Sequence, residues 1–245
     1  MPPEGDRLAA CYCYLPTGLI DMARKTKIDA LKTRQLLIDT AIVEFAARGV
    51  SCTTLTDIAQ AAGVTRGAVY WHFASKEALF NEIWKQQIPV REMVAPLLPA
   101  HIKQDPLRLL RETLILSLQY VACNPRWRAL LQILYRKCEF TGEMISEEEI
   151  RKQIGFNREA MRNMLRQCVE SGQVVETINT EMVLIIFYAC LSGIIKNWLS
   201  QVDGLDLYNQ AEEIVDNMLA MLPRREPYSD IKPAVESYPP ALSPL

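Results

Sequence analysis

The sequence predicts an all-α protein in which a three-helix unit precedes a larger helical bundle. Apolar residues recur at spacings of three or four along most of the 245 residues, as they do on the buried face of a helix. Helix start signals, such as Asp105-Pro106 and Asn124-Pro125, precede several of these runs. No stretch of note has the alternating pattern of a strand. A chain of this length can hold two domains with cores of their own.

Local charge divides the chain, although its formal net charge is only −2. Residues 22–77 carry eight Lys or Arg and five Asp or Glu, whereas residues 78–222 carry fifteen and eighteen. A basic segment on a mildly acidic body is typical of a DNA-binding module joined to another domain. We therefore expect a DNA-binding domain at 22–77 and a second domain at 78–222.

Cysteine and histidine usage excludes several classes of protein. Seven dispersed cysteines without CxxC spacing favour reduced, buried thiols in a cytoplasmic protein over a thiol-based redox switch. With two histidines in the chain, neither a His-based metal centre nor a cofactor is expected. The sequence has no nucleophile–base set and no phosphate-cradling glycine loop, so these features do not indicate an enzyme.

The two ends of the chain differ from its middle. Residues 1–21 hold three prolines and show no helical period, and their charges leave no apolar core for a signal peptide. We expect a disordered leader or a misassigned start there. Residues 223–245 are rich in proline, lack a period and are expected to be disordered.

The first helix is expected from Asp29 to Arg48, where Gly49 ends it. Before it stands a basic run that contains Arg24, Lys25 and Lys27. As a flexible arm this run can follow the phosphates or enter the minor groove of DNA; as a solvated tail it does neither, and the sequence leaves both alternatives open. The helix would bury one face, formed by Leu37, Ile38, Ala41, Ile42 and Phe45.

Residues 53–79 read as two short helices, a tight turn and the start of a third helix. Thr54 can cap the first of them, with Asp57 completing a capping box. Gly63 suits the left-handed conformation of a sharp turn. Thr65 and Ser75 are placed to cap the second and third helices, and Val69 and Phe73 face the core.

Two helices joined by a glycine-containing turn form a helix-turn-helix, whose second helix enters the major groove of DNA. Arg66 at the start of that helix can donate two hydrogen bonds to guanine. The alternative is a helical hairpin with an aromatic core, but three consecutive aromatic rings at 70–72 cannot all face one core. The candidate DNA-binding residues are Lys25, Thr54, Thr65, Arg66, Gly67, Tyr70, Trp71, His72 and Lys76.

The body is expected to continue as helices. The third helix runs through Trp84 towards Gln87, and Pro89 kinks it or ends it. The prolines at 96 and 99 bound a loop that reaches the helix start at Asp105-Pro106. A helix from Asn124-Pro125 ends near Cys138, and one long helix runs from the capping box at 146–149 to Glu170.

Residues 182–199 are apolar on nearly all sides, so this helix must be buried on nearly all sides. Glu181 and Lys196 bracket only fourteen residues, which is short for a membrane span. We expect one face to form a subunit interface with the last helix, as a four-helix arrangement of two copies. The candidate dimer residues are Ile186, Cys190, Gly193, Ile194, Trp198, Ile214 and Met218.

The pattern Ile58-Ala59, Ala62-Gly63-Val64, Gly67, Tyr70, His72-Phe73, Lys76, Leu79 resembles the signature of the TetR family of transcriptional regulators, and residues 64–73 resemble its AcrR branch. Weaker matches at 137–144, 192–199 and 206–208 resemble its EnvR-type multidrug-efflux repressors. The resemblance implies a homodimer on an inverted-repeat operator in double-stranded DNA. Hydrophobic or cationic drugs would bind in the body as inducers and release it.

In this family the resemblance also places a ligand pocket within the body. Relatives have an acidic residue shortly after the counterpart of Trp84, where this chain has Gln86-Gln87-Ile88, so cation recognition there is unsupported. A second hypothesis is a DNA-bound regulator whose C-terminal domain binds another protein or a specific metabolite. The candidate pocket residues are Trp84, Gln119, Ile133, Phe140, Phe156, Met164 and Tyr188.

Overall fold

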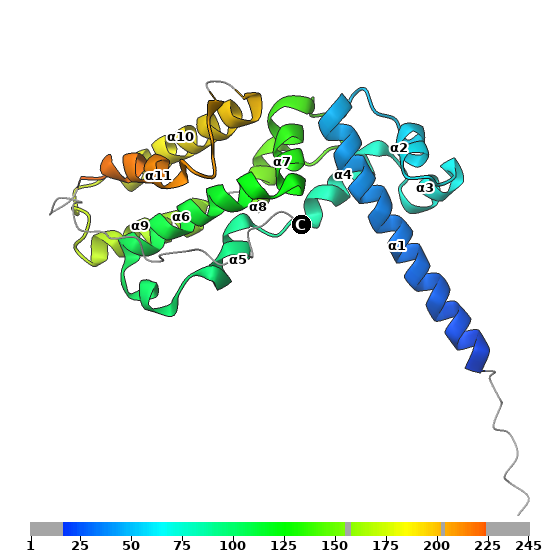
Figure 1. Cartoon of the computed structure of the whole chain (residues 1–245), viewed down its shortest axis with the longest axis horizontal. Helices are drawn as coiled ribbons and strands as arrows, with labels where there is room; N and C mark the ends of the chain where they lie inside the picture. Colours follow the sequence, from blue (N-terminus) through cyan, green and yellow to red (C-terminus); the bar gives the residue numbers. More distant parts are fainter. Residues whose placement is uncertain (1–16, 155–157, 202–203, 224–245) are drawn as a thin grey trace, which may run out of the picture.

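The computed structural model describes residues 17–154, 158–201 and 204–223, with side chains from residue 27 onward. These residues form helices and no strand, so the all-α prediction is confirmed. Most of the expected leader, and the expected tail after Pro223, lie outside the described residues. Figure 1 shows a small unit of α1 to α4 at one end and a bundle of α5 to α11 at the other.

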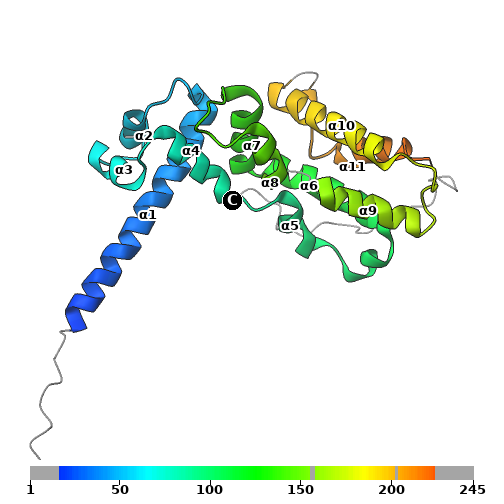
Figure 2. The same ribbon diagram turned by 180° about the vertical axis from the view of Figure 1, so that it is seen from behind.

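Helix α1 spans Thr17–Arg48 and begins twelve residues before the predicted start at Asp29. Arg24, Lys25 and Lys27 therefore belong to a helix and do not form a flexible arm. The physical reason is that residues 20–30 contain neither glycine nor proline, so nothing stops the helix there. Figure 2 shows this part of α1 projecting beyond the rest of the unit.

The helix-turn-helix consists of α2 (Leu55–Ala61), α3 (Arg66–His72) and the turn between them. The predicted caps are confirmed: Thr54 forms a capping box with Asp57, and Thr65 accepts from the Ala68 N–H at 3.2 Å. Gly63 has a φ of +68°, which explains glycine in the turn. Ser75 caps α4, which spans Lys76–Lys85.

The core of this unit joins α1 to the three short helices. Phe45 of α1 and Phe80 of α4 are fully buried, with ring centroids 6.4 Å apart. The Arg34 guanidinium lies 5.0 Å from the Phe73 ring centre and donates to Glu82 at 3.1 Å. These contacts hold α3 and α4 in one orientation relative to α1.

The body begins after Pro89 with α5 (Val90–Val94) and the 3₁₀ turns η1 (Ala95–Leu97) and η2 (Ala100–Gln104), which replace the expected loop. The central helix α6 (Pro106–Cys123) has Asp105 as its cap, as predicted. Asn124 caps α7 (Pro125–Gln132), and the π-helical turn η3 (Ile133–Lys137) follows. The last three elements before α11 are α8 (Glu147–Ile154), α9 (Arg158–Glu170) and α10 (Thr180–Ser200).

The helix expected up to Glu170 is described in two parts, α8 and α9, and residues 155–157 between them lie outside the described residues. The start is as predicted, since Ser146 Oγ accepts from the Glu149 N–H at 3.2 Å.

Helix α11 (Ala211–Ala220) packs on α6, whereas α10 packs against α9 and α7. Arg111 of α6 is buried and fixes α11, donating to both carboxylate oxygens of Asp216 at 2.6 and 2.8 Å. It also donates to Glu212 at 2.5 Å and to its buried neighbour Glu112 at 2.9 Å. Both ribbon views place α10 and α11 along one edge of the body.

Hydrogen bonds and an ion pair between described residues join the small unit to the body. The Val50 N–H donates to the carbonyl oxygen of Lys137, on η3, at 2.9 Å. Arg126 of α7 pairs with Asp39 of α1. Asn81 of α4 donates to the Glu143 carbonyl at 2.9 Å and accepts from the Ile145 N–H at 2.7 Å. The small unit is thus connected to η3, to α7 and to the segment that leads into α8.

Candidate DNA interface and ligand cavity

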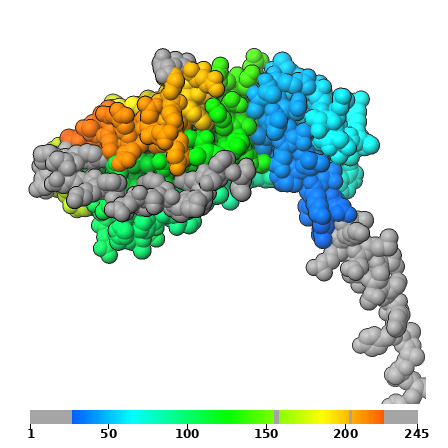
Figure 3. Space-filling view, in the orientation of Figure 1, coloured from blue at the N-terminus to red at the C-terminus, as the bar shows by residue number. Residues whose placement is uncertain are grey.

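Helix α3 exposes most of the residues predicted to contact DNA. Thr65, Arg66 and Gly67 are exposed at its N-terminal end, and Tyr70 and Trp71 remain 47% and 72% exposed. Large aromatic side chains with that much exposure are not contributing to the core of the unit. Only Val69 of this helix is buried. Figure 3 shows the surface of α1 to α3, in blue and cyan, at the end of the molecule opposite the orange α11.

The polar groups at the start of α3 remain available to a ligand. Arg66 extends over the Tyr70 ring, with its Cζ 5.3 Å from the centroid, so its planar face is supported while its edge stays exposed. Thr65 Oγ1 accepts from Ala68, which leaves its hydroxyl proton for donation. A Cβ added at Gly67 would only touch Thr65 Oγ1 at 4.0 Å. The fold does not require glycine there, whereas close approach of a groove wall would.

Thr54 and His72 have structural partners. The Thr54 hydroxyl donates to Asp57 at 2.7 Å, so it positions α2 and has no proton to spare for a phosphate. Hydrogen bonds from the Thr54 N–H and hydroxyl, aided by Arg48, hold the pKa of Asp57 below its usual range. Burial, and then the nearby Arg34, lower the pKa of His72, so its ring is neutral at pH 7. A neutral ring offers one N–H to DNA and no charge.

Lys76 is half-buried, and its Nζ donates to the carbonyl oxygens of Val50 at 2.7 Å and Ser51 at 3.4 Å. The predicted phosphate contact would have to use the remaining N–H of the ammonium group. Lys25, the other predicted basic contact, lies on α1 where side chains are outside the described residues. Both DNA contacts stay predictions.

We expect Lys76→Met to lower the free energy of unfolding by about 1–3 kcal/mol, because the Val50 carbonyl loses its charged donor. Urea unfolding measures this, with Lys85→Met on the exposed end of the same helix as control. If Nζ also binds a phosphate, the slope of operator affinity against salt concentration should become shallower by about one phosphate contact. An unchanged salt slope would contradict the phosphate contact.

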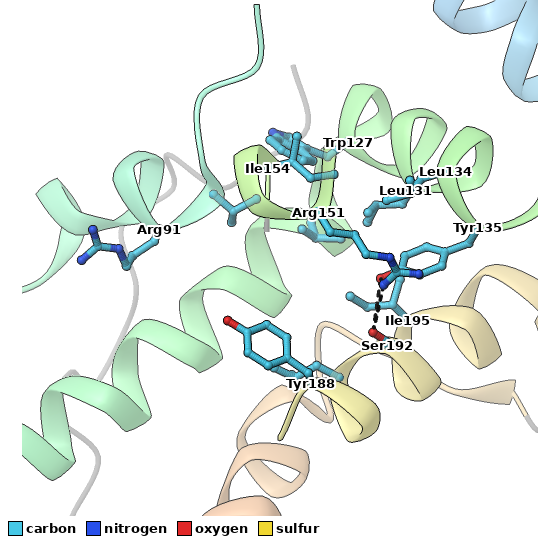
Figure 4. A pocket seen from close by; sticks show the side chains of 13 residues that line it. Arg91, Trp127, Leu131, Leu134, Tyr135, Arg151, Ile154, Tyr188, Ser192 and Ile195 are labelled. Carbon is cyan, nitrogen blue, oxygen red and sulfur yellow. Dashed lines mark hydrogen bonds between the residues drawn. The ribbon is translucent and has the colours of Figure 1, made fainter. Parts of the chain in front are cut away.

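A cavity opens in the body, with about 660 Å³ of space that includes its open mouth. Its walls come from α5, α6, α7, η3, α8 and α10, which are far apart in the sequence. Figure 4 shows apolar side chains around most of it and a polar group at one end. The residues that line it are Val90, Arg91, Val121, Trp127, Leu131, Leu134, Tyr135, Arg151, Ile154, Tyr188, Leu191, Ser192 and Ile195.

Of the seven predicted pocket residues, Tyr188 alone lines this cavity, and its burial raises its pKa to about 12. Phe156 lies outside the described residues. The other five do not line it. On η3 the π-turn shifts the side-chain register, so Leu134 and Tyr135 face the cavity in place of Ile133. The Phe140 ring packs 6.1 Å from Phe80 of the DNA-binding unit.

The remaining three are in the core: Trp84 is fully buried, and Gln119 and Met164 are less than a tenth exposed. Neither Trp84 Nε1 nor Gln119 Oε1 has a hydrogen-bond partner among the described residues. What the sequence missed is the α7–η3–α8 wall. Its residues have the spacing of ordinary core, so no local signal separates them from core residues.

The two faces of α10 have different roles. Leu184, Phe187 and Leu191 are buried on its inner face. Its outer face exposes Met182 and Ile185 at 51% and Ile186 at 39%. Among the described residues, α10 alone is long and apolar enough to cross a membrane by length and composition. The inner face packs against α9 and α7 as a core helix does.

The predicted dimer residues divide between these surroundings. Ile186 is exposed, and Cys190, Gly193, Ile194 and Ile214 are half-buried. Trp198 and Met218 are 7% and 4% exposed in the protomer, and their place in an interface stays a prediction. Arg128 covers the Trp198 ring, with its Cζ 4.7 Å from the centroid. Met182, Ile185 and Met221 are further exposed apolar residues on α10 and at the end of α11.

None of the described cysteines forms a disulfide, and Cys52 is exposed, contrary to the expectation of burial. Cys168 is fully buried. Burial, followed by the charges of Glu147 and Glu139, raises the pKa of Cys138 to about 11. A thiol with that pKa is protonated at neutral pH and is a poor nucleophile.

The exposed short helix after a glycine turn, on a body with its own cavity, defines a helix-turn-helix DNA-binding regulator. Residues 37–83 match the profile of the bacterial regulatory proteins of the tetR family. Residues 105–224 match the C-terminal region of MAATS-type transcriptional repressors. The chain belongs to the TetR family, whose members are DNA-binding regulators and not enzymes.

The chain is similar to known regulators along most of its length. It is 52% identical to the probable acrEF/envCD operon repressor of Escherichia coli K12 over 200 residues, which cover 82% of this chain and 91% of the relative. It is 38% identical to the regulator AcrR of Shigella flexneri over 82% of this chain and 94% of that protein. The crystal structure of NalD, the secondary repressor of the MexAB-OprM multidrug efflux pump in Pseudomonas aeruginosa, is 30% identical. It superposes with a TM-score of 0.65 over 81% of this chain and 99% of NalD.

Proposed function

We propose that this protein is a dimeric, ligand-responsive repressor that controls a multidrug efflux operon from the cytoplasm. Residues 22–77 would be the DNA-binding domain, and residues 78–222 the ligand-binding and dimerisation domain. The observation that carries the proposal is the 52% identity to a probable efflux-operon repressor, together with the exposed face of α3. Two copies would place two α3 helices in successive major grooves of an inverted repeat.

Repression in this proposal needs no chemistry. The bound dimer blocks access of the polymerase, and a ligand in the cavity lowers its affinity for the operator. The operator would be released or bound according to which arrangement of the two α3 helices the body favours. Mapping the bound DNA across the genome tests this, with enrichment expected at one or a few efflux-pump promoters. Enrichment only at unrelated promoters would contradict the operon assignment.

The structure provides two connections from the cavity to the DNA-binding unit. Leu134 and Tyr135 line the cavity on η3, and Lys137 of the same turn accepts from Val50. Arg151 and Ile154 line it on α8, which follows the segment bonded to Asn81. Helix α4 ends at Lys85, two residues before the Gln87 towards which the sequence extends it. We propose that η3 and the 143–145 segment transmit ligand binding.

We expect Asn81→Ala to weaken this coupling by about 0.5–2 kcal/mol, because α4 loses both bonds to the 143–145 segment. Operator affinity is measured with and without an inducer found by calorimetry against hydrophobic dyes and biocides. The control is Asn163→Ala, an exposed asparagine bonded only within α9. Equal release by inducer in the two variants would rule out this route. A regulator that no small molecule releases would favour the alternative of a protein partner.

A further inference from the structure

The cavity has one polar end, and the groups there are hydrogen-bond donors. Arg151 of α8 donates from Nη1 to the Tyr135 hydroxyl at 3.1 Å and to Ser192 Oγ at 3.3 Å. Its Cζ lies 4.6 Å from the centre of the Tyr135 ring. Figure 4 shows this group gathered on one side of the cavity, whereas the Arg91 guanidinium points away from it.

The two hydroxyl groups keep their protons for a ligand. Both oxygens accept from the Arg151 guanidinium, so each retains an O–H to donate. The Tyr135 hydroxyl lies 3.5 Å from Ser192 Oγ, at the limit of a hydrogen bond, so a better acceptor would take its proton. Together the group offers two neutral donors beside a cation.

The charge of this end is positive, and its counter-ion is on the solvent side. Glu147 accepts from Arg151 Nε at 2.8 Å, but its side chain is about half exposed and does not line the cavity. Lys196 places a second cation 5.5 Å from the Tyr135 ring centre. Among the described residues that line the cavity, none is an aspartate or a glutamate. An organic cation inside would therefore meet like charge and no carboxylate.

We propose that the cavity takes an apolar, fused-ring molecule with a carboxylate, phenolate or similar acceptor at one end. Arg151, Tyr135 and Ser192 would bind that end. The apolar walls from Trp127, Leu131 and Ile195 would cover the rings. The inference rests on the proposed function in taking this molecule to be the inducer, and it excludes cations as preferred ligands of this cavity.

The test compares two fluorescent molecules of the same shape and opposite charge, anthracene-9-carboxylate and 9-(aminomethyl)anthracene. Titration of the full-length dimer should show tighter binding of the carboxylate, by on the order of tenfold or more, because charge-assisted hydrogen bonds form only with it. Arg151→Met should remove this preference. Ser192→Ala, which leaves the charge in place, should weaken carboxylate binding by about three- to tenfold through the loss of one hydrogen bond.

The matched control is Lys152→Met, which removes the same charge one residue further along α8. Lys152 is exposed and pairs with Glu148 at 2.8 Å, and it does not line the cavity. Its variant should keep the preference for the carboxylate. Should Arg151→Met not fold, the Ser192→Ala result decides.

Equal or tighter binding of the ammonium compound would overturn the inference, and so would a failure of both probes to bind. Operator binding by the unliganded dimer is measured separately. If operator binding is intact while the protein does not prefer the carboxylate probe, the proposed ligand class is wrong and the proposed regulatory function stands. If operator binding is absent while the protein prefers the carboxylate probe, the proposed ligand class stands and the proposed function is wrong.

Discussion

Arg66→Ala is expected to lower operator affinity by about 1–3 kcal/mol and to relax the preference for one base pair in each half-site. Arg66 is exposed at the first position of α3, and its guanidinium rests on the Tyr70 ring. The ring restricts the side chain before DNA binds, so less entropy is lost when it forms two hydrogen bonds to a guanine. Fluorescence anisotropy with the operator and with base-substituted operators measures both effects.

Arg166→Ala is the control for this variant. Arg166 is an exposed arginine on α9, so its removal changes the net charge equally without changing α3. Arg166→Ala should therefore bind all sequences as the parent does. If Arg66→Ala bound the operator as tightly as the parent, the assignment of base contacts to Arg66 would be wrong.

Ile186→Glu is expected to shift the protein from dimer to monomer, raising the dimer dissociation constant by on the order of a hundredfold or more. Because the expected interface is two-fold symmetric, each of the two subunits places one carboxylate in it, and burying an unpaired charge is costly. Operator binding should fall with it, because a monomer reads one half-site. Sedimentation velocity measures the oligomeric state, and anisotropy measures the affinity.

Met93→Glu provides a matched control. Met93 on α5 is 39% exposed, as Ile186 is, but α5 is not part of the expected interface. Its variant should sediment as the parent does. If both variants were dimers, or both monomers, the outer face of α10 would not be the specific contact between subunits.

Tertiary packing accounts for what the spacing of the residues did not show. The Trp198 position has the same apolar spacing as Ile186, but Arg128 from α7 covers it within the protomer. The cavity wall at 134–135 depends on a π-turn, whose altered register no apolar spacing shows. Arg151 lies among charged residues in the sequence, and its contacts with Tyr135 and Ser192 join elements far apart along the chain.

The sequence by itself determined the helix-turn-helix, because its signals act over three or four residues. Thr54 with Asp57, Gly63, and Thr65 with Ala68 are close enough along the chain for each motif to fix its own local geometry. It also predicted that two faces of the 182–199 helix would be covered, of which the structure shows the inner one buried. Only the tertiary structure decided which face meets the cavity and which remains exposed. That choice depends on how α7, α8 and α9 pack around α10, and packing between distant segments leaves no local trace.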